Sequence, residues 1–283
     1  MASPRPTDFC FIIGAAKSGT TALFNALCKH SEICGPKMKE PHFFSFDETY
    51  ALGIDYYLNL FPNWEAPRHR LAIDASATYS HSPKLADTAR RIHEFNPGAR
   101  FIYIMRNPFE RIRSHNQMFM TFGRESLAVS KEVEQNYLNI SKYYYQLSRY
   151  RQYFPKGALL PLTLDQMIAE PGKMLSRIFE HLCVKADADV TYEKQHSSDL
   201  LYSMYFIKRS LKERGDIDGG ATTRDAWNYF NGIGENERKE IKKIAAGQFE
   251  IDEGNMERFR RALRDDMKAL ADEYGIDVAA WGF

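Results

Sequence analysis

The sequence predicts an α/β fold, a three-layer sandwich with a central parallel sheet and a helical C-terminal region. Two observations indicate this class. Short apolar runs flanked by turn-forming residues recur from residue 9 to residue 164, as buried parallel strands do, and helical segments follow them. A glycine-containing loop joins the first run to the first helical segment, as in P-loop-like folds. We expect one domain over 1–283, with an α/β core at 8–183 and a mainly helical part at 184–283.

Four apolar runs are the candidate strands. Each is short and flanked by residues that break regular structure, which is typical of the central strands of a parallel sheet. The runs are Phe9–Ile13, Leu71–Ile73, Phe101–Met105 and Ala158–Leu164.

Five segments carry helix start signals or helical periodicity. In three of them a proline occupies the expected first helical position, and in two of these Ser82 or Asn107 precedes it as N-cap. The last segment repeats apolar residues at steps of three and four and stops at Gly275. The predicted helices begin at Thr20, Pro83, Pro108, Pro171 and about Met256, and the second is expected to end near Asn96.

The composition is that of an ordinary globular protein. Of 283 residues, 44% are hydrophobic and 27% charged, which excludes a disordered or fibrous chain. No stretch reaches the roughly 18 apolar residues that cross a bilayer, and a net charge of +1 gives no reason to expect nucleic acid as a partner. Four irregularly spaced cysteines indicate free thiols. We expect a soluble, cytoplasmic protein, unless an N-terminal anchor lies outside this chain, and its oligomeric state is left open.

The strongest local signal is the loop 14–21, which follows a predicted strand and opens a predicted helix. Backbone N–H groups at a helix N-terminus favour a phosphate or sulfate, and Lys17 adds a full positive charge. In the ATP-binding P-loop, G-x-x-x-x-G-K-[ST], lysine follows the second glycine, whereas here Thr20 stands there. The loop therefore predicts P-loop-like phosphate binding of another kind. The alternative is a strand–helix turn without a ligand.

A second anion site is predicted at Arg106. This residue emerges at the carboxyl end of a central strand, where open α/β sheets bind ligands, and its planar guanidinium suits a phosphate. Ser114 lies two turns into the following helix and could reach the same anion. Two anion sites on neighbouring strand ends fit a nucleotide with phosphates at both ends of its ribose. The alternative for Arg106 is an ion pair with Glu110.

The loop 37–45 supplies candidate acid/base groups. Glu40 and His42 lie there among lysines and aromatic residues, and a partly desolvated glutamate near an acceptor hydroxyl would serve as a general base. The alternative is that Glu40 is a surface carboxylate. His81 and His115 are weaker alternative bases.

Together these motifs resemble the sulfotransferases that use 3′-phosphoadenosine 5′-phosphosulfate (PAPS). Loop 14–21 is similar to their 5′-phosphosulfate loop, with Ala16 where proline is common, and 106–114 is similar to their 3′-phosphate motif. The stretch 39–44, Lys-Glu-Pro-His-Phe-Phe, resembles the heparan-sulfate-type branch, in which the matching glutamate acts as base. The resemblance covers about 8–183.

The resemblance implies transfer of a sulfuryl group from PAPS to an acceptor hydroxyl, or an amine, by in-line displacement. The acceptor would be a small molecule or a carbohydrate, and no metal would be required. The implied catalytic residues are Glu40, Lys17 and His42, and the implied cofactor-binding residues are Ala16, Lys17, Ser18, Gly19, Thr20, Thr21, Arg106 and Ser114.

Departures from the heparan-type pattern leave the acceptor open. The stretch 74–76, Asp-Ala-Ser, lacks the lysine often found there, and Ser45 replaces a frequent aspartate. A late cofactor loop at 208–215 matches poorly. Two other functions remain: a P-loop kinase using ATP and magnesium, and a non-catalytic module that binds an anionic glycan through the basic, acid-free stretch 135–164.

Overall fold

The computed structural model describes residues 5–121, 131–193, 207–208, 211–218, 220–238, 240, 251 and 253–283. It contains a five-stranded parallel sheet in the order β2-β3-β1-β4-β5. The strands are β1 Phe9–Gly14, β2 Ile33–Cys34, β3 Leu71–Ala75, β4 Arg100–Met105 and β5 Leu159–Thr163. The four predicted strands are confirmed, and β2 is an additional short one.

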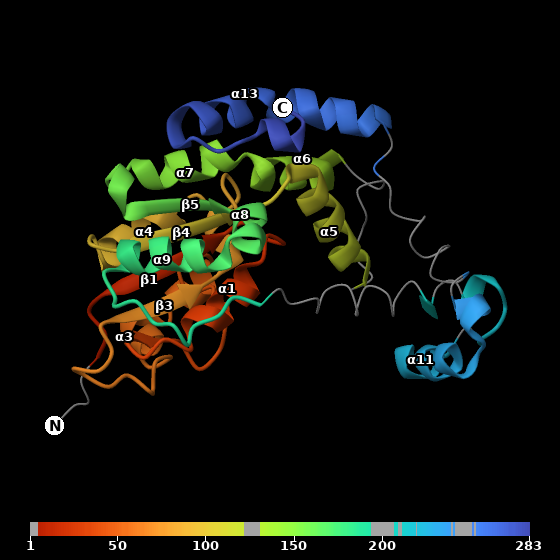
Figure 1. Ribbon diagram of the computed structural model, residues 1–283, viewed down its shortest axis with the longest axis horizontal. Helices are drawn as coiled ribbons and strands as arrows, with labels where there is room; N and C mark the ends of the chain where they lie inside the picture. The colour runs from red at the N-terminus through yellow and green to blue at the C-terminus, as the bar shows by residue number, and fades with distance from the viewer. Residues whose placement is uncertain are drawn as a thin grey trace.

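Alternation along the strands divides the core into two layers. In β1, Phe9 and Phe11 pack into one hydrophobic cluster while Cys10 and Ile12 pack into another on the opposite face. Helices α1, α8 and α9 cover the second face, and α3, α4, α7 and α13 cover the first, so the fold is the expected three-layer α/β sandwich (Figure 1). The helices are α1 Thr20–Leu27, α2 Asp47–Tyr50, α3 Gly53–Leu58, α4 Thr88–Phe95, α5 Pro108–Thr121, α6 Lys131–Ser141, α7 Tyr143–Arg151, α8 Leu164–Ala169, α9 Pro171–Leu182, α11 Thr223–Gly232 and α13 Glu253–Tyr274, with 3₁₀ turns η1 Ala77–Ser80, η2 Lys156–Ala158 and η3 Ala279–Trp281.

Helix α5 begins where its proline predicts, whereas α4 does not. The Asn107 side chain accepts a hydrogen bond from the Phe109 N–H at 3.0 Å and so caps α5. The predicted start of α4 at Pro83 is wrong, because α4 begins at Thr88. Ser82 is held in a turn instead: its N–H donates to Gln146 Oε1 at 3.0 Å and its carbonyl accepts from Gln146 Nε2 at 2.9 Å.

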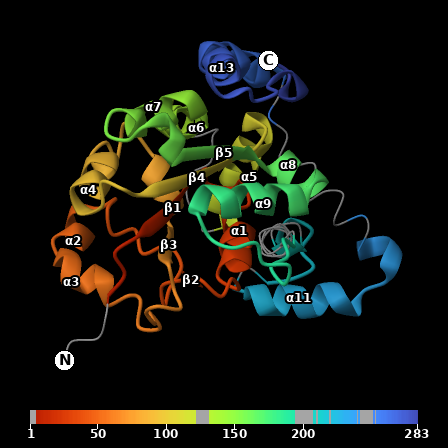
Figure 2. The same cartoon turned by 60° about the vertical axis from the view of Figure 1, so that its left-hand side comes forward.

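The last helix packs along α6 and α7 (Figures 1 and 2). The Asp266 carboxylate of α13 accepts the backbone N–H groups of Tyr144 and Tyr145 at 3.0 and 2.8 Å, and so caps the start of α7. Burial raises the pKa of Asp266 to about 6, while these two N–H donors oppose that rise. The described residues after 185 hold helices and loops and no strand, as expected. No helix in the described ranges combines the length and apolarity needed to cross a bilayer.

Candidate active site

The loop after β1 has the backbone of an anion cradle. The Ala15 N–H donates to the Ile104 carbonyl at 2.7 Å, which ties the loop to β4. Lys17 and Gly19 adopt the left-handed conformation, with φ of 68° and 90°. Gly19 is the N-cap of α1 and has no side chain to satisfy the first helical N–H groups. An anion at this position could accept hydrogen bonds from those groups.

One side chain in this loop supports that reading. The Ser18 hydroxyl oxygen is buried and makes no hydrogen bond within 3.5 Å to a described residue. The Tyr143 hydroxyl is its polar neighbour, but it donates its own proton to the Arg106 carbonyl. A buried hydroxyl without a partner is costly, and an anion oxygen would satisfy it. Thr20 is buried beside it, whereas Thr21 is exposed. The residues present therefore fit a phosphate or sulfate group.

Arg106 follows β4, and both its backbone and its side chain form hydrogen bonds. Its carbonyl accepts the Tyr143 hydroxyl at 2.6 Å. Its guanidinium bonds one Glu110 oxygen through two nitrogens, at 2.9 and 2.7 Å, so the ion pair considered as the alternative is present. Glu110 is 48% exposed. Such i,i+4 pairs contribute only about 0.3–0.5 kcal/mol, so a phosphate could displace or share this contact. Ser114 is half-buried two turns further along α5.

Glu40 and His42 come together in the loop before α2. His42 Nε2 lies 3.5 Å from Glu40 Oε2, and Lys39 forms an ion pair with the other Glu40 oxygen. Glu40 and His42 both have positive φ, 59° and 53°, a conformation that costs energy in residues other than glycine. Glu40 is 36% exposed and so remains open to an acceptor.

Hydrogen bonds from the segment after β3 hold His42. Its N–H donates to Ser76 Oγ at 3.1 Å, and its Nδ1 lies 2.8 Å from Thr78 Oγ1, which in turn contacts Ser45 Oγ at 2.6 Å. Because Nε2 faces a carboxylate, we assign its proton to Nε2 and let Nδ1 accept from Thr78. Burial lowers the pKa of His42, against the opposing effect of Glu40, and favours this neutral form.

Behind Ser76 lies a buried acid that sequence reasoning did not assign to the site. Asp74, at the end of β3, accepts hydrogen bonds from Ser76 Oγ at 2.8 Å, Tyr79 at 2.7 Å and Tyr57 at 3.1 Å. Burial raises the pKa of Asp74 to about 6, and these three donors oppose that rise. The acid thus fixes Ser76, which fixes the His42 backbone. Its sequence signal was the polar pair 74 and 76 at the end of an apolar run.

The 3₁₀ turn η1 joins the anion cradle to the Glu40 loop. Ala16 of the cradle packs against Ala77 of η1, and a side chain at Gly14 would place its Cβ 2.2 Å from Ser80 Oγ. Gly14 therefore permits the close approach of β1 and η1. Since Thr78 lies in the same turn and holds His42, the cradle and the Glu40 loop are supported by one element.

The two other candidate histidines are poor proton acceptors. Burial lowers the pKa of His81 to about 3, helped by the positive charge of Arg111. Burial also lowers the pKa of His115, with Arg111, His81 and Lys17 adding to the effect, and Arg111 lies 3.0 Å from its Nδ1.

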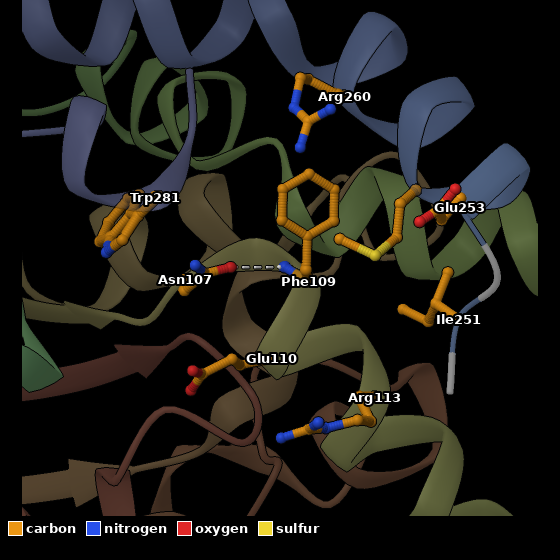
Figure 3. A pocket seen from close by; sticks show the side chains of 9 residues that line it. Asn107, Phe109, Glu110, Arg113, Ile251, Glu253, Arg260 and Trp281 are labelled. Carbon is orange, nitrogen blue, oxygen red and sulfur yellow. Dashed lines mark hydrogen bonds between the residues drawn. The ribbon is translucent and has the colours of Figure 1, made fainter. Parts of the chain in front are cut away.

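A cavity of about 470 Å³ opens beside the start of α5 (Figure 3). It combines apolar walls with charged groups from α5 and the C-terminal region, and Figure 3 shows Glu110 and Arg113 on one side and Arg260 on the other. It therefore borders the Arg106 motif. Its lining residues are Asn107, Phe109, Glu110, Arg113, Ile251, Glu253, Met256, Arg260 and Trp281.

The sequence also predicted a late cofactor loop and no need for a metal ion. The late loop predicted at 208–215 falls partly outside the described residues, which omit 209–210. Over the described part of the chain, no group of three or more histidine, cysteine, aspartate or glutamate side chains could hold a metal ion.

Comparison with known proteins identifies relatives of the part of the chain that carries these residues. A family model described as "Sulfotransferase domain" matches residues 7–200. The chain is 27% identical over 197 residues to bifunctional heparan sulfate N-deacetylase/N-sulfotransferase 1 of Caenorhabditis briggsae, covering 60% of this chain and 22% of that protein. It is 30% identical over 176 residues to heparan sulfate glucosamine 3-O-sulfotransferase 5 of Mus musculus, covering 56% of this chain and 49% of that one. The matches thus span about half or less of these relatives.

A solved structure shows the same fold. The sulfotransferase from Alicyclobacillus acidocaldarius superposes with a TM-score of 0.68 at 21% identity, covering 99% of this chain and 100% of that one.

Proposed function

The chain belongs to the sulfotransferase domain family, and we propose that it transfers a sulfuryl group from PAPS to the hydroxyl group, or less favourably the amine, of an acceptor. The observation that carries the proposal is the anion cradle after β1, in which Ser18 is buried without a partner and Lys17 supplies positive charge, on the strand next to the one that delivers Arg106. A small molecule or a carbohydrate would serve as acceptor.

The reaction forms one bond and breaks one. The acceptor oxygen bonds to sulfur while the bond from sulfur to the bridging oxygen breaks, and that oxygen keeps the electron pair as part of the 5′-phosphate of 3′,5′-adenosine bisphosphate. When bound, PAPS supplies the activated sulfuryl group. This chain has to position the two reactants, compensate the charge on the leaving oxygen and accept one proton, as in phosphoryl transfer.

Each of these tasks falls to particular residues. Lys17 compensates the charge on the leaving oxygen, while the amides of loop 14–21 with Ser18, Thr20 and Thr21 hold the 5′-phosphate. Arg106 and Ser114 hold the 3′-phosphate, which distinguishes PAPS from ATP. Glu40 accepts the acceptor proton, and His42, held by Thr78, orients Glu40.

Ligand-induced stabilisation tests the donor. We expect 3′,5′-adenosine bisphosphate without metal to raise the unfolding temperature, because a ligand that binds only the folded state adds about 2.7 kcal/mol at 100 times its Kd. Stabilisation by ATP with magnesium but not by the bisphosphate would support a P-loop kinase instead and contradict the proposal.

The variant Arg106→Ala locates the 3′-phosphate. It should weaken binding of 3′,5′-adenosine bisphosphate by about tenfold or more, the scale of a charged hydrogen-bonded contact, and leave 5′-AMP binding nearly unchanged. Calorimetric titration of both ligands measures the difference. Glu110→Gln is the matched control, since it removes the negative charge that pairs with Arg106 and should not weaken binding of the bisphosphate. Equal losses for both ligands would place Arg106 outside the 3′-phosphate site.

The variant Thr78→Val tests the support of His42. It keeps the shape of the side chain but removes the hydroxyl that contacts His42 Nδ1 and Ser45. We expect kcat to fall about tenfold while the KM for PAPS stays constant, because a general-base contribution of about 10²–10⁴ depends on orientation. Thr78→Ser restores the hydroxyl and should restore kcat. Equal activity of the valine and serine variants would show that this hydrogen bond has no catalytic role.

A further inference from the structure

Exposed apolar side chains surround the Glu40 loop. Of the six large hydrophobic residues that are exposed among the described residues, four fall between residues 38 and 56, in the Glu40 loop, in α3 or at the N-caps of α2 and α3. The apolar rim consists of Met38 (54% exposed), Phe46 (37%), Leu52 (54%) and Tyr56 (42%). A concentration of this kind beside a polar site indicates a binding surface rather than the scattered exposure of ordinary surfaces.

The rim is attached to the candidate acid/base pair. The Phe46 ring lies 5.9 Å from the His42 ring, centroid to centroid. The Thr49 hydroxyl lies within hydrogen-bond distance of the carbonyls of His42 and Phe43, both at 3.1 Å, and of Phe46 at 3.0 Å, so its one proton holds α2 against the loop. Tyr56 stacks on Phe43 at 6.5 Å. Leu52 is the N-cap of α3 and directly precedes Gly53, whose φ of 83° makes a turn between Leu52 and the helix that carries Tyr56. An acceptor whose hydroxyl reaches Glu40 would therefore meet this rim.

The charges around the rim are unsuited to a polyanion. From residue 40 to residue 67 the sequence holds five acids and no lysine or arginine. Two of these acids, Asp47 and Asp55, are about 85% exposed and pair with Arg91 and Arg5. Just before this range, two lysines flank Met38: Lys39 is paired with Glu40, and Lys37 is exposed. A sulfated or carboxylated chain lying on the rim would gain no row of unpaired cations there and would meet acids instead.

The basic stretch 135–164, which the sequence offered as an anionic-glycan surface, packs against α13, and its Lys156 is already engaged by that helix. Lys156 donates to the carbonyl of Glu273 at 2.7 Å and lies over the Tyr274 ring, so α13 occupies its surroundings. Asp266 of α13 caps α7 in the same stretch. In Figures 1 and 2, α13 and α7 lie together near β5, at the opposite end of the sheet from β3 and α3.

We propose that the acceptor is an uncharged alcohol with a hydrophobic body, which lies against the apolar rim with its hydroxyl at Glu40 and His42. This inference rests on the proposed sulfuryl transfer. The rim removes the apolar body from water, and the absence of cations from residues 40–67 selects against the sulfated polysaccharides.

Acceptor profiling tests the proposal. Transfer of labelled sulfate from PAPS is measured with a series of primary alcohols from hexanol to dodecanol and with N-sulfated heparosan, the unsulfated precursor being included. We expect kcat/KM to rise about fourfold for each added methylene group that the rim buries, as apolar burial predicts, and the polysaccharides to accept no label.

The variant Leu52→Asp should raise the KM for dodecanol at least tenfold, because it places a charge on the rim at an exposed position that should not disturb folding. Its matched control is Ile168→Asp, at another exposed apolar residue, on α8, which should leave that KM unchanged. Unfolding temperatures and stabilisation by 3′,5′-adenosine bisphosphate should be equal in wild type and both variants.

The outcomes separate the two proposals. Label on the polysaccharide, or alcohol transfer that does not depend on chain length, overturns the hydrophobic acceptor while supporting sulfuryl transfer. Stabilisation by the bisphosphate without transfer to either class also overturns the acceptor. Absence of both that stabilisation and all transfer overturns the proposed function itself.

Discussion

Replacing Lys17 with alanine is expected to lower the turnover of sulfuryl transfer by about 10² or more, the scale on which enzymes lose a charge placed at a developing anion. Lys17 lies in a loop whose backbone is hydrogen-bonded to β4. The residue after it, Ser18, has a buried hydroxyl that makes no hydrogen bond to a described residue. Negative charge grows on the bridging oxygen as sulfur departs, so a cation there stabilises the transition state more than the bound donor.

The measurement is kcat under saturating PAPS, with the KM for PAPS determined separately. A fall in kcat much larger than the rise in KM would show that Lys17 acts on the transition state. Lys29→Ala, at an exposed lysine just beyond α1, is the matched control and should retain normal turnover. An increase in KM alone would reduce Lys17 to a binding residue.

Sequence patterns predicted the sheet well because its strands are buried on both faces. β1 and β4 are nearly continuous apolar runs, and that pattern marks a central parallel strand. β2 was missed because it has two residues, Ile33 and Cys34, which pair only with the start of β3. Two residues carry no periodicity, so only the tertiary pairing defines this strand.

The start of α4 shows how tertiary contacts override a local signal. Ser82 followed by proline is typical of a helix start, yet Gln146 from α7 bonds both backbone groups of Ser82 and holds it outside the helix. That partner lies 64 residues away in the sequence. No local pattern contains such a contact.

The candidate site divides in the same way. The positions of loop 14–21 and Arg106 at strand ends could be predicted, because each follows an apolar strand directly. The hydrogen bonds that hold His42 could not be predicted, because they join Ser76 and Thr78, which follow β3, to a loop more than 30 residues earlier in the sequence. Asp74 stood in the sequence only as a departure from a related pattern, and its buried hydrogen bonds give it a physical role.

Replacing Glu40 with glutamine is expected to lower turnover by about 10² or more when the acceptor is an alkyl alcohol, because the amide keeps the size of the side chain but cannot accept a proton. Glu40 is suited to this task by its position, open to solvent on one side and facing His42 Nε2 at 3.5 Å on the other. The KM for PAPS should not change, since Glu40 lies in the loop before α2, whereas the proposed PAPS-binding residues follow β1 and β4.

Acceptor acidity makes this test specific for proton transfer. A nitrophenol gives up its proton far more readily than an alkyl alcohol, so a base contributes less to its reaction, and Glu40→Gln should then cost clearly less with the nitrophenol than with the alcohol. Glu48→Gln, at an exposed acid in α2, is the matched control and should behave as wild type with both acceptors. Equal losses with the two acceptors would mean that Glu40 positions the acceptor without taking its proton. Near-normal turnover of Glu40→Gln would exclude Glu40 as the base.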